Sequence, residues 1–122
     1  MPHTILIVDD NALLRCMLRT CLEQDPEWNV CGEAENGRVA VEKVVALKPD
    51  IVLLDLQMPI MNGLEAARRI RVVAPNTTML MFTMHCSPQL LQEARAAGIR
   101  EVFSKTDQLV DHLLPALRQA SA

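Results

Sequence analysis

Residues 5–10 read ILIVDD, four consecutive apolar residues followed at once by two carboxylates. The same arrangement returns in IVLLD at residues 51–55 and in MLMFT at residues 79–83, where each run ends at a polar side chain. Continuous apolar runs of this length are typical of strands buried on both faces of a parallel sheet. Each run therefore predicts a central strand with a polar residue at its carboxyl end.

Two other segments predict weaker strands. Val30-Cys31-Gly32 and Glu101–Ser104 are interrupted by Gly, Glu or Ser, as strands at the edge of a sheet can be. Between the strands, apolar residues recur at helical spacing and predict five helices. These helical patterns occupy residues 13–22, 39–47, 64–70, 90–97 and 109–117. Five strands that alternate with five helices predict an α/β fold, a doubly wound parallel sheet with helices on both faces. The strand order 2-1-3-4-5 places the continuous runs in the middle of that sheet.

Several residues mark where the helices start and stop. Asp10 or Asn11 is placed to cap the first helix, and Gly98 to close the fourth. Pro115 falls inside the last helical pattern, where it removes a backbone donor. We therefore expect either a kink at Pro115 or a new helix that starts there.

Length and composition exclude several classes of protein. With 122 residues, half of them hydrophobic, we expect residues 1–122 to form a single domain with a core over about residues 4–119. The net charge of −3 disfavours direct nucleic-acid binding. The longest charge-free stretch, residues 72–92, contains two Pro and several polar residues, so we expect no membrane span. Because the N-terminal residues run straight into a predicted strand, we expect no secretory signal. The four Cys lack zinc spacing, so we also expect reduced thiols and a cytoplasmic location.

The polar residues that follow the strands carry the chemical information. Asp9, Asp10, Asp55, Thr83 and Lys105 each stand where a strand is predicted to end. In an open parallel sheet these ends meet in one crevice. Three carboxylates in one place repel one another, and Mg2+ prefers such oxygen ligands. The ammonium and hydroxyl groups can pair with phosphoryl oxygens, so the set suits phosphoryl transfer to a carboxylate.

These motifs resemble the receiver domain of bacterial two-component response regulators. The resemblance runs from about Thr4 to Gln119 and is specific because all its parts occur in order. It is carried by ILIVDD at residues 5–10, LDLQMPIMNG at residues 54–63, Thr83, Ala97-Gly98 and Lys105. It implies a flavodoxin-like (βα)5 fold with the same strand order.

The resemblance also implies roles for the metal-binding and phosphoacceptor positions. Asp55 matches the phosphoacceptor, which receives its phosphoryl group from a phosphohistidine on a sensor histidine kinase or a phosphotransfer protein. Asp10 matches the direct Mg2+ ligand, and Asp9 matches an acid that acts mostly through water. The backbone carbonyl of Gln57 would be a further ligand.

Other positions correspond to the switch. Lys105 matches the lysine that contacts the phosphoryl group, and Thr83 matches the hydroxyl that moves towards it. Met84 stands where many members have a small residue, and it could narrow access to Asp55. His85 is either a residue that tunes the phosphoryl lifetime or part of an exposed loop.

The chain departs from the family at two more places. Val102 occupies the aromatic switch position, and Phe103 next to it should point to the opposite face of the strand. Thr106 follows Lys105 at a position where many members have Pro, so a cis X-Pro bond cannot order that loop.

The predicted function is a phosphorylatable signalling switch rather than a turnover enzyme. It would act on an attached or partner output domain, for example a helix-turn-helix transcription regulator, through the face formed by the fourth helix, fifth strand and fifth helix. A homodimer formed on phosphorylation is left open. One alternative is a pseudo-receiver that binds partners without phosphorylation. Another is a haloacid dehalogenase-like phosphatase, which needs an acid where Gln57 stands.

Overall fold

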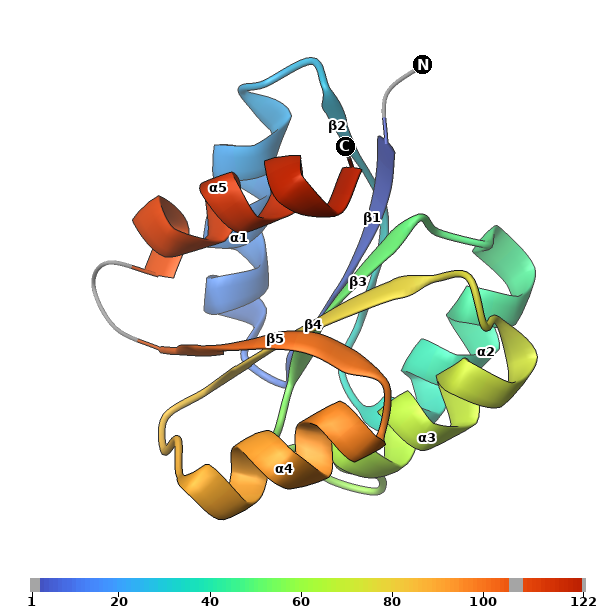
Figure 1. Ribbon diagram of the computed structural model, residues 1–122. Coiled ribbons are helices and arrows are strands. Elements are labelled where there is room, and N and C mark those ends of the chain that lie inside the picture. The colour runs from blue at the N-terminus through green and yellow to red at the C-terminus, as the bar shows by residue number, and fades with distance from the viewer. Residues whose placement is uncertain (1–2, 106–108, 122) are drawn as a thin grey trace.

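The computed structural model describes residues 3–105 and 109–121, in which strands and helices alternate along the chain (Figure 1). The strands are β1 (His3–Val8), β2 (Trp28–Ala34), β3 (Ile51–Asp55), β4 (Thr78–Thr83) and β5 (Ile99–Ser104). The helices are α1 (Ala12–Glu23), α2 (Gly37–Leu47), α3 (Gly63–Val73), α4 (Pro88–Ala96) and α5 (Leu109–Ser121). All neighbouring strands are parallel, and their order is β2-β1-β3-β4-β5. The predicted flavodoxin-like fold and strand order are therefore confirmed.

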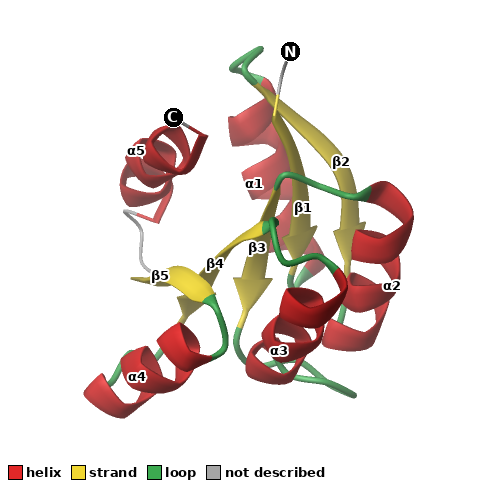
Figure 2. Ribbon diagram, turned by 45° about the vertical axis from the view of Figure 1, so that its right-hand side comes forward, coloured by secondary structure: helices red, strands yellow, loops and turns green. Residues whose placement is uncertain are grey.

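Helices cover both faces of the sheet and form two separate cores. Helices α1 and α5 lie on one side, and α2, α3 and α4 lie on the other (Figures 1 and 2). Alternate strand residues serve the two cores: Ile5 and Ile7 pack with α1 and α5, whereas Leu6 and Val8 pack with the other three helices. This two-sided burial explains why β1, β3 and β4 are continuous apolar runs.

Polar caps start the helices that follow the first four strands. The Asn11 side chain accepts hydrogen bonds from the backbone N–H groups of Leu13 and Leu14, which identifies it as the cap of α1. Asn36, Asn62 and Ser87 cap α2, α3 and α4 in the same way. The connections from β1, β2 and β4 to their helices are short, whereas a longer loop of residues 56–62 joins β3 to α3.

The structure corrects some expectations about the helices. Helix α5 runs through Pro115 without a break, so a new helix start at that residue is wrong. Within α1, Leu18 and Leu22 are buried, but Leu13 is 79% and Met17 43% exposed. The apolar stripe of α1 is wider than the arc that faces the sheet, and spacing alone could not tell which edge of the stripe stays outside. None of the described helices has the length and apolar character of a membrane span.

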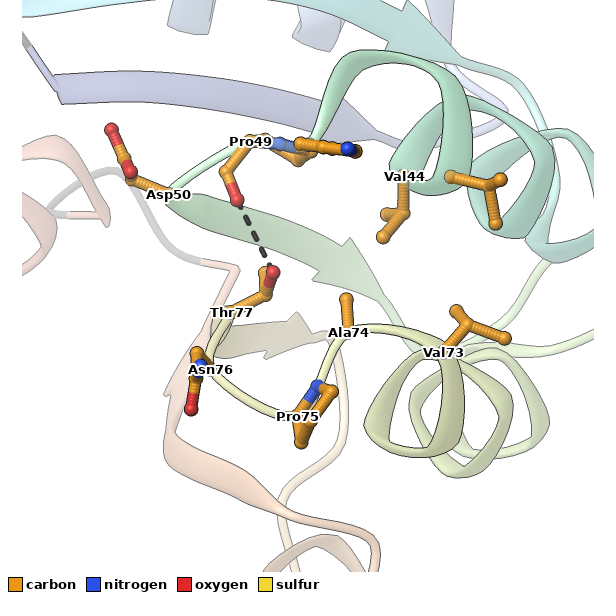
Figure 3. A pocket seen from close by; sticks show the side chains of 10 residues that line it. Val44, Pro49, Asp50, Val73, Ala74, Pro75, Asn76 and Thr77 are labelled. Carbon is orange, nitrogen blue, oxygen red and sulfur yellow. Dashed lines mark hydrogen bonds between the residues drawn. The ribbon is translucent and has the colours of Figure 1, made fainter.

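A cavity of about 720 Å³ lies where the strands begin, at the edge opposite the polar strand ends (Figure 3). The C-terminal ends of α2 and α3 form its walls, with Val44 and Ala74 among its lining residues. A hydrogen bond from Thr77 Oγ1 to the Pro49 carbonyl, 3.2 Å long, joins two of its loops. None of the predicted site residues lines this cavity.

Replacing Lys48 with glycine should stabilise the protein. Lys48 closes α2 in the left-handed conformation, with φ 49° and ψ 58°, and it is exposed. A side chain with a Cβ is strained there, and glycine is not. We expect Lys48→Gly to raise the free energy of unfolding by about 0.5–1 kcal/mol, measured by urea denaturation.

Lys48→Ala is the matched control, because it removes the same charge and keeps the Cβ. If Lys48→Gly were no more stable than Lys48→Ala, strain at this helix end would be ruled out.

Candidate functional site

Five polar side chains from the ends of four strands stand at the carboxyl edge of the sheet. Asp55 and Thr83 are the last residues of β3 and β4, and Lys105 follows β5 directly. Asp9 and Asp10 follow β1. Carboxylate oxygens of Asp9, Asp10 and Asp55 all lie within 4.8 Å of one another. The structure thus brings together residues that are up to 96 positions apart in the sequence, from Asp9 to Lys105 (105 − 9).

Lys105 links two of the three carboxylates. Its Nζ atom lies 2.8 Å from Asp9 Oδ2 and 3.1 Å from Asp55 Oδ1. The Lys105 ammonium is also 5.2 Å from the centre of the Phe82 ring, and its backbone N–H donates to the Thr83 carbonyl. Asp9 and Asp55 are almost fully buried, so water can hardly solvate their negative charges. The Lys105 ammonium compensates for this lost solvation.

The backbone around Asp55 is closely packed against the loop that follows it. The Gly63 N–H donates to the Leu56 carbonyl at 2.8 Å. A Cβ added at Gly63 would stand only 2.3 Å from the carbonyl oxygen of Asp55. Only glycine allows this approach, so Gly63 lets the start of α3 lie directly against the end of β3.

The environment raises the pKa of the Asp55 carboxyl to about 6. Burial is the main cause, and the charge of Asp9 adds to it, while the hydrogen bond and charge of Lys105 oppose the change. For Lys105, burial acts to lower the pKa, but the hydrogen bonds and charges of Asp9 and Asp55 outweigh it, so the pKa is raised. Lys105 therefore stays charged while the carboxylates still carry excess negative charge.

This donor set fits a hard divalent cation. Three carboxylates offer oxygen atoms within one 4.8 Å cluster, and one ammonium does not neutralise them all. Mg2+ is bound through one or two carboxylates, with water and phosphate oxygens in its remaining positions. Asp10 is exposed and can offer its oxygen to such an ion from the solvent side.

The Thr83 hydroxyl is buried and bonded within its own loop. It accepts a hydrogen bond from the His85 N–H at 3.3 Å and lies 3.4 Å from the His85 carbonyl, to which it donates. Met84 is 65% exposed, and the His85 side chain is exposed as well. The hydroxyl is thus held by the backbone of the segment that connects β4 to α4.

The remaining predicted positions lie around this cluster. Val102 packs with the core under α2, α3 and α4, whereas Phe103 packs with the core under α1 and α5. The prediction that Phe103 points to the opposite face is confirmed. Gln57 is exposed in the loop after β3. Thr106 lies outside the described residues.

Sequence reasoning missed one polar network next to the carboxylates. Arg15 of α1 donates to the backbone carbonyl of Asp9 and also contacts Glu33 of β2. Arg19, one turn further along α1, contacts the other oxygen of Glu33. Burial acts to raise the pKa of Glu33, but the bonds and charges of Arg19 and Arg15 outweigh it and lower that pKa. The signal available in the sequence was two arginines one helical turn apart in the first helix, and an acidic residue directly after the predicted second strand.

Comparison with known proteins agrees with this geometry. The family model of the response regulator receiver domain matches residues 5–114. The chemotaxis protein CheY of Thermotoga maritima is 40% identical over 108 residues, which covers 88% of this chain and 89% of CheY. The nitrate/nitrite response regulator NarL of Escherichia coli K12 is 36% identical over 121 residues, 99% of this chain and 56% of NarL.

A solved structure shows the same fold. The response regulator domain of Thermotoga maritima CheB superposes with a TM-score of 0.93 at 32% identity, covering 98% of this chain and 96% of that one. The chain spans 23% to 30% of the length of the protein-glutamate methylesterases that also match, and 56% of NarL. Most of the chain is covered by the family model and by these relatives, and the chain therefore belongs to the response regulator receiver domain family.

Proposed function

We propose that this receiver domain accepts a phosphoryl group on Asp55 and acts as a switch in a phosphorelay. The observation that carries the proposal is the Lys105 ammonium, which lies between Asp9 and Asp55 in a cluster of three carboxylates. An ammonium in this position can pair with a phosphoryl oxygen once Asp55 carries one. Phosphoryl transfer to a carboxylate depends mainly on positioning the reactants and neutralising their negative charge, and Lys105 supplies part of that neutralisation.

In the proposed transfer, an oxygen of Asp55 attacks the phosphorus of a phosphohistidine. The new O–P bond forms as the P–N bond breaks, and the electron pair of that bond stays on the imidazole nitrogen of the donor. Lys105 pairs with a phosphoryl oxygen. The Thr83 hydroxyl donates to another phosphoryl oxygen after its hydrogen bond to the His85 carbonyl breaks. Asp9, Asp10, Asp55 and the backbone carbonyl of Gln57 would hold Mg2+, which neutralises negative charge on the phosphoryl group.

The domain's partners follow from the same proposal. The donor is a sensor histidine kinase or a phosphotransfer protein, and the response passes to an attached or partner output domain through the face of α4, β5 and α5. A helix-turn-helix transcription regulator is one such output, and a phosphorylation-dependent homodimer is another way to use this face. We propose that residues 1–122 act as one receiver domain in the cytoplasm, without nucleic-acid binding or turnover of their own.

Treatment with a small phosphodonor and Mg2+ should add a single phosphoryl group, on Asp55. Lys105 contacts both Asp9 and Asp55, but Asp55 ends a strand and keeps 4% of its surface exposed, whereas Asp9 has none. Intact-mass analysis should show the added group in the wild type and in Asp50→Asn, which removes an exposed carboxylate at the other edge of the sheet. The group should be absent in Asp55→Asn.

Three results are distinguishable in this experiment. Stoichiometric labelling supports the switch, and many turnovers of the donor would identify an enzyme instead. No labelling of the wild type would identify a pseudo-receiver.

The free energy of unfolding of the metal-free protein should depend on pH through the ionisation of Asp55. The folded state raises the pKa of Asp55 from 3.8 to about 6, so the folded state binds this proton more tightly than the unfolded state. Stability should therefore fall as the pH rises from about 4 to above 6, because ionised Asp55 is disfavoured in the fold. Asp55→Asn lacks this loss.

Unfolding experiments in EDTA should show the difference between Asp55→Asn and the wild type growing by roughly 2–3 kcal/mol between pH 4 and pH 8. Added Mg2+ should reduce the difference at pH 8, since a cation stabilises the ionised carboxylates. A difference that stays constant over this pH range would contradict the raised pKa.

The switch should depend on Thr83 more than on Val102. Val102 is smaller than the aromatic residue usual at its position and is stiff at χ1, so it cannot swing through the same volume. The loop of Thr83, Met84 and His85 leads directly into α4 and can move that helix. Backbone amide shifts with a beryllofluoride phosphoryl mimic should therefore change in α4 in the wild type and in Val102→Ala, but not in Thr83→Ala.

Loss of the α4 response in Val102→Ala would show instead that residue 102 couples the site to this face. Retention of the response in Thr83→Ala would remove the hydroxyl from the switch.

A further inference from the structure

Arg15 connects the carboxylate cluster to the edge strand β2. Its Nε atom lies 2.9 Å from Glu33 Oε1, and its Nη1 atom donates to the backbone carbonyl of Asp9. The Arg15 side chain is only 17% exposed. The planar guanidinium can make both contacts at once because its donors point in fixed directions.

The Asp9 carbonyl matters because it belongs to the peptide unit that leads into Asp10. Two further hydrogen bonds of this turn involve Asp9. Its N–H donates to the Ala34 carbonyl at 3.0 Å, and its Oδ1 accepts from the Asn11 N–H at 2.8 Å. The Asp10 side chain is exposed, and no hydrogen bond to it is found within residues 3–105 and 109–121. The backbone must therefore place the Asp10 carboxylate, and Arg15 fixes the orientation of the peptide just before it.

We propose that Arg15 is a positioning residue for the metal site, acting through the peptide between Asp9 and Asp10. The inference rests on the proposed function, because it assumes that this cluster binds Mg2+. Glu33 holds the guanidinium of Arg15 in place from β2. Groups behind the ligands of a metal site commonly change its affinity by about 10–100-fold when they are removed.

Arg19 provides a matched comparison within the same network. It lies on the same helix, and its Nε atom contacts the other carboxylate oxygen of Glu33 at 2.8 Å. Arg19 also pairs with Glu23, and it makes no contact with the Asp9 carbonyl. Both arginines stabilise the packing of α1 against β2, but only Arg15 reaches the peptide of the metal site. A role in packing alone predicts the same outcome for both.

The test is Mg2+ binding to the full chain, measured by calorimetry at one pH, together with thermal unfolding. Arg15→Gln should weaken Mg2+ binding about tenfold, whereas Arg19→Gln should stay within about twofold of the wild type. Arg15→Lys keeps the charge and one hydrogen bond, so it should recover part of the loss. Asp10→Asn sets the scale for loss of a ligand. In the metal-free protein, the amide shifts of Asp10 and Asn11 should change in Arg15→Gln and not in Arg19→Gln.

Equal Mg2+ affinity and equal amide shifts in Arg15→Gln and Arg19→Gln would overturn the inference. Should Arg15→Gln fail to fold, Arg15→Lys carries the same comparison, and wild-type affinity in that variant together with unchanged amide shifts would overturn it. A wild-type protein that binds no Mg2+ would instead overturn the proposed function, and the inference with it.

Discussion

The contact of the Lys105 ammonium with Asp9 and Asp55 is the constraint on which the site depends. Two carboxylates that are almost fully out of water are costly unless a positive charge lies beside them. The strand order meets this need, because β1 and β3 are neighbours and bring the two acids together, while β5 lies two strands away from β3, beyond β4. Lys105 reaches across the end of β4 with its ammonium near the Phe82 ring. A different strand order would leave the acids without this partner.

The sheet also separates the side chains of β5 that lie near this edge into two different cores. Val102 and Phe103 are adjacent in β5 but pack into different cores, so a change at one of them is felt first by a different set of helices than a change at the other. The segment from Thr83 to His85 is exposed apart from Thr83 itself. The hydrogen bonds of the Thr83 hydroxyl within this segment are long, at 3.3–3.4 Å, and therefore weak. The acids are therefore held by the buried contacts with Lys105, whereas the hydroxyl is held by these two longer hydrogen bonds.

The sequence was sufficient to predict the features that depend on long apolar runs. Runs such as ILIV at residues 5–8 predicted the central strands. The polar residues after these runs and after the weaker fifth strand predicted where Asp9, Asp55 and Lys105 would meet. It was not sufficient where several arrangements satisfy the same pattern. The exposure of Leu13 depends on how α1 is rotated against the sheet, and the path of α5 through Pro115 depends on packing that outweighs one lost backbone donor. The contact of Arg15 with a backbone carbonyl has no sequence pattern, because every residue carries such a carbonyl.

The order in which the site residues occur along the chain has a consequence for biosynthesis. The carboxylates belong to the first and third strands, whereas Lys105 follows the last strand. A nascent chain that has already paired β1 with β3 thus holds three neighbouring acids without their ammonium. These contacts span most of the sequence, and forming them requires closing long loops. Lys105 can relieve this electrostatic cost only after β5 has joined the sheet, so the last strand of the domain to be synthesised brings the charge that balances the acids.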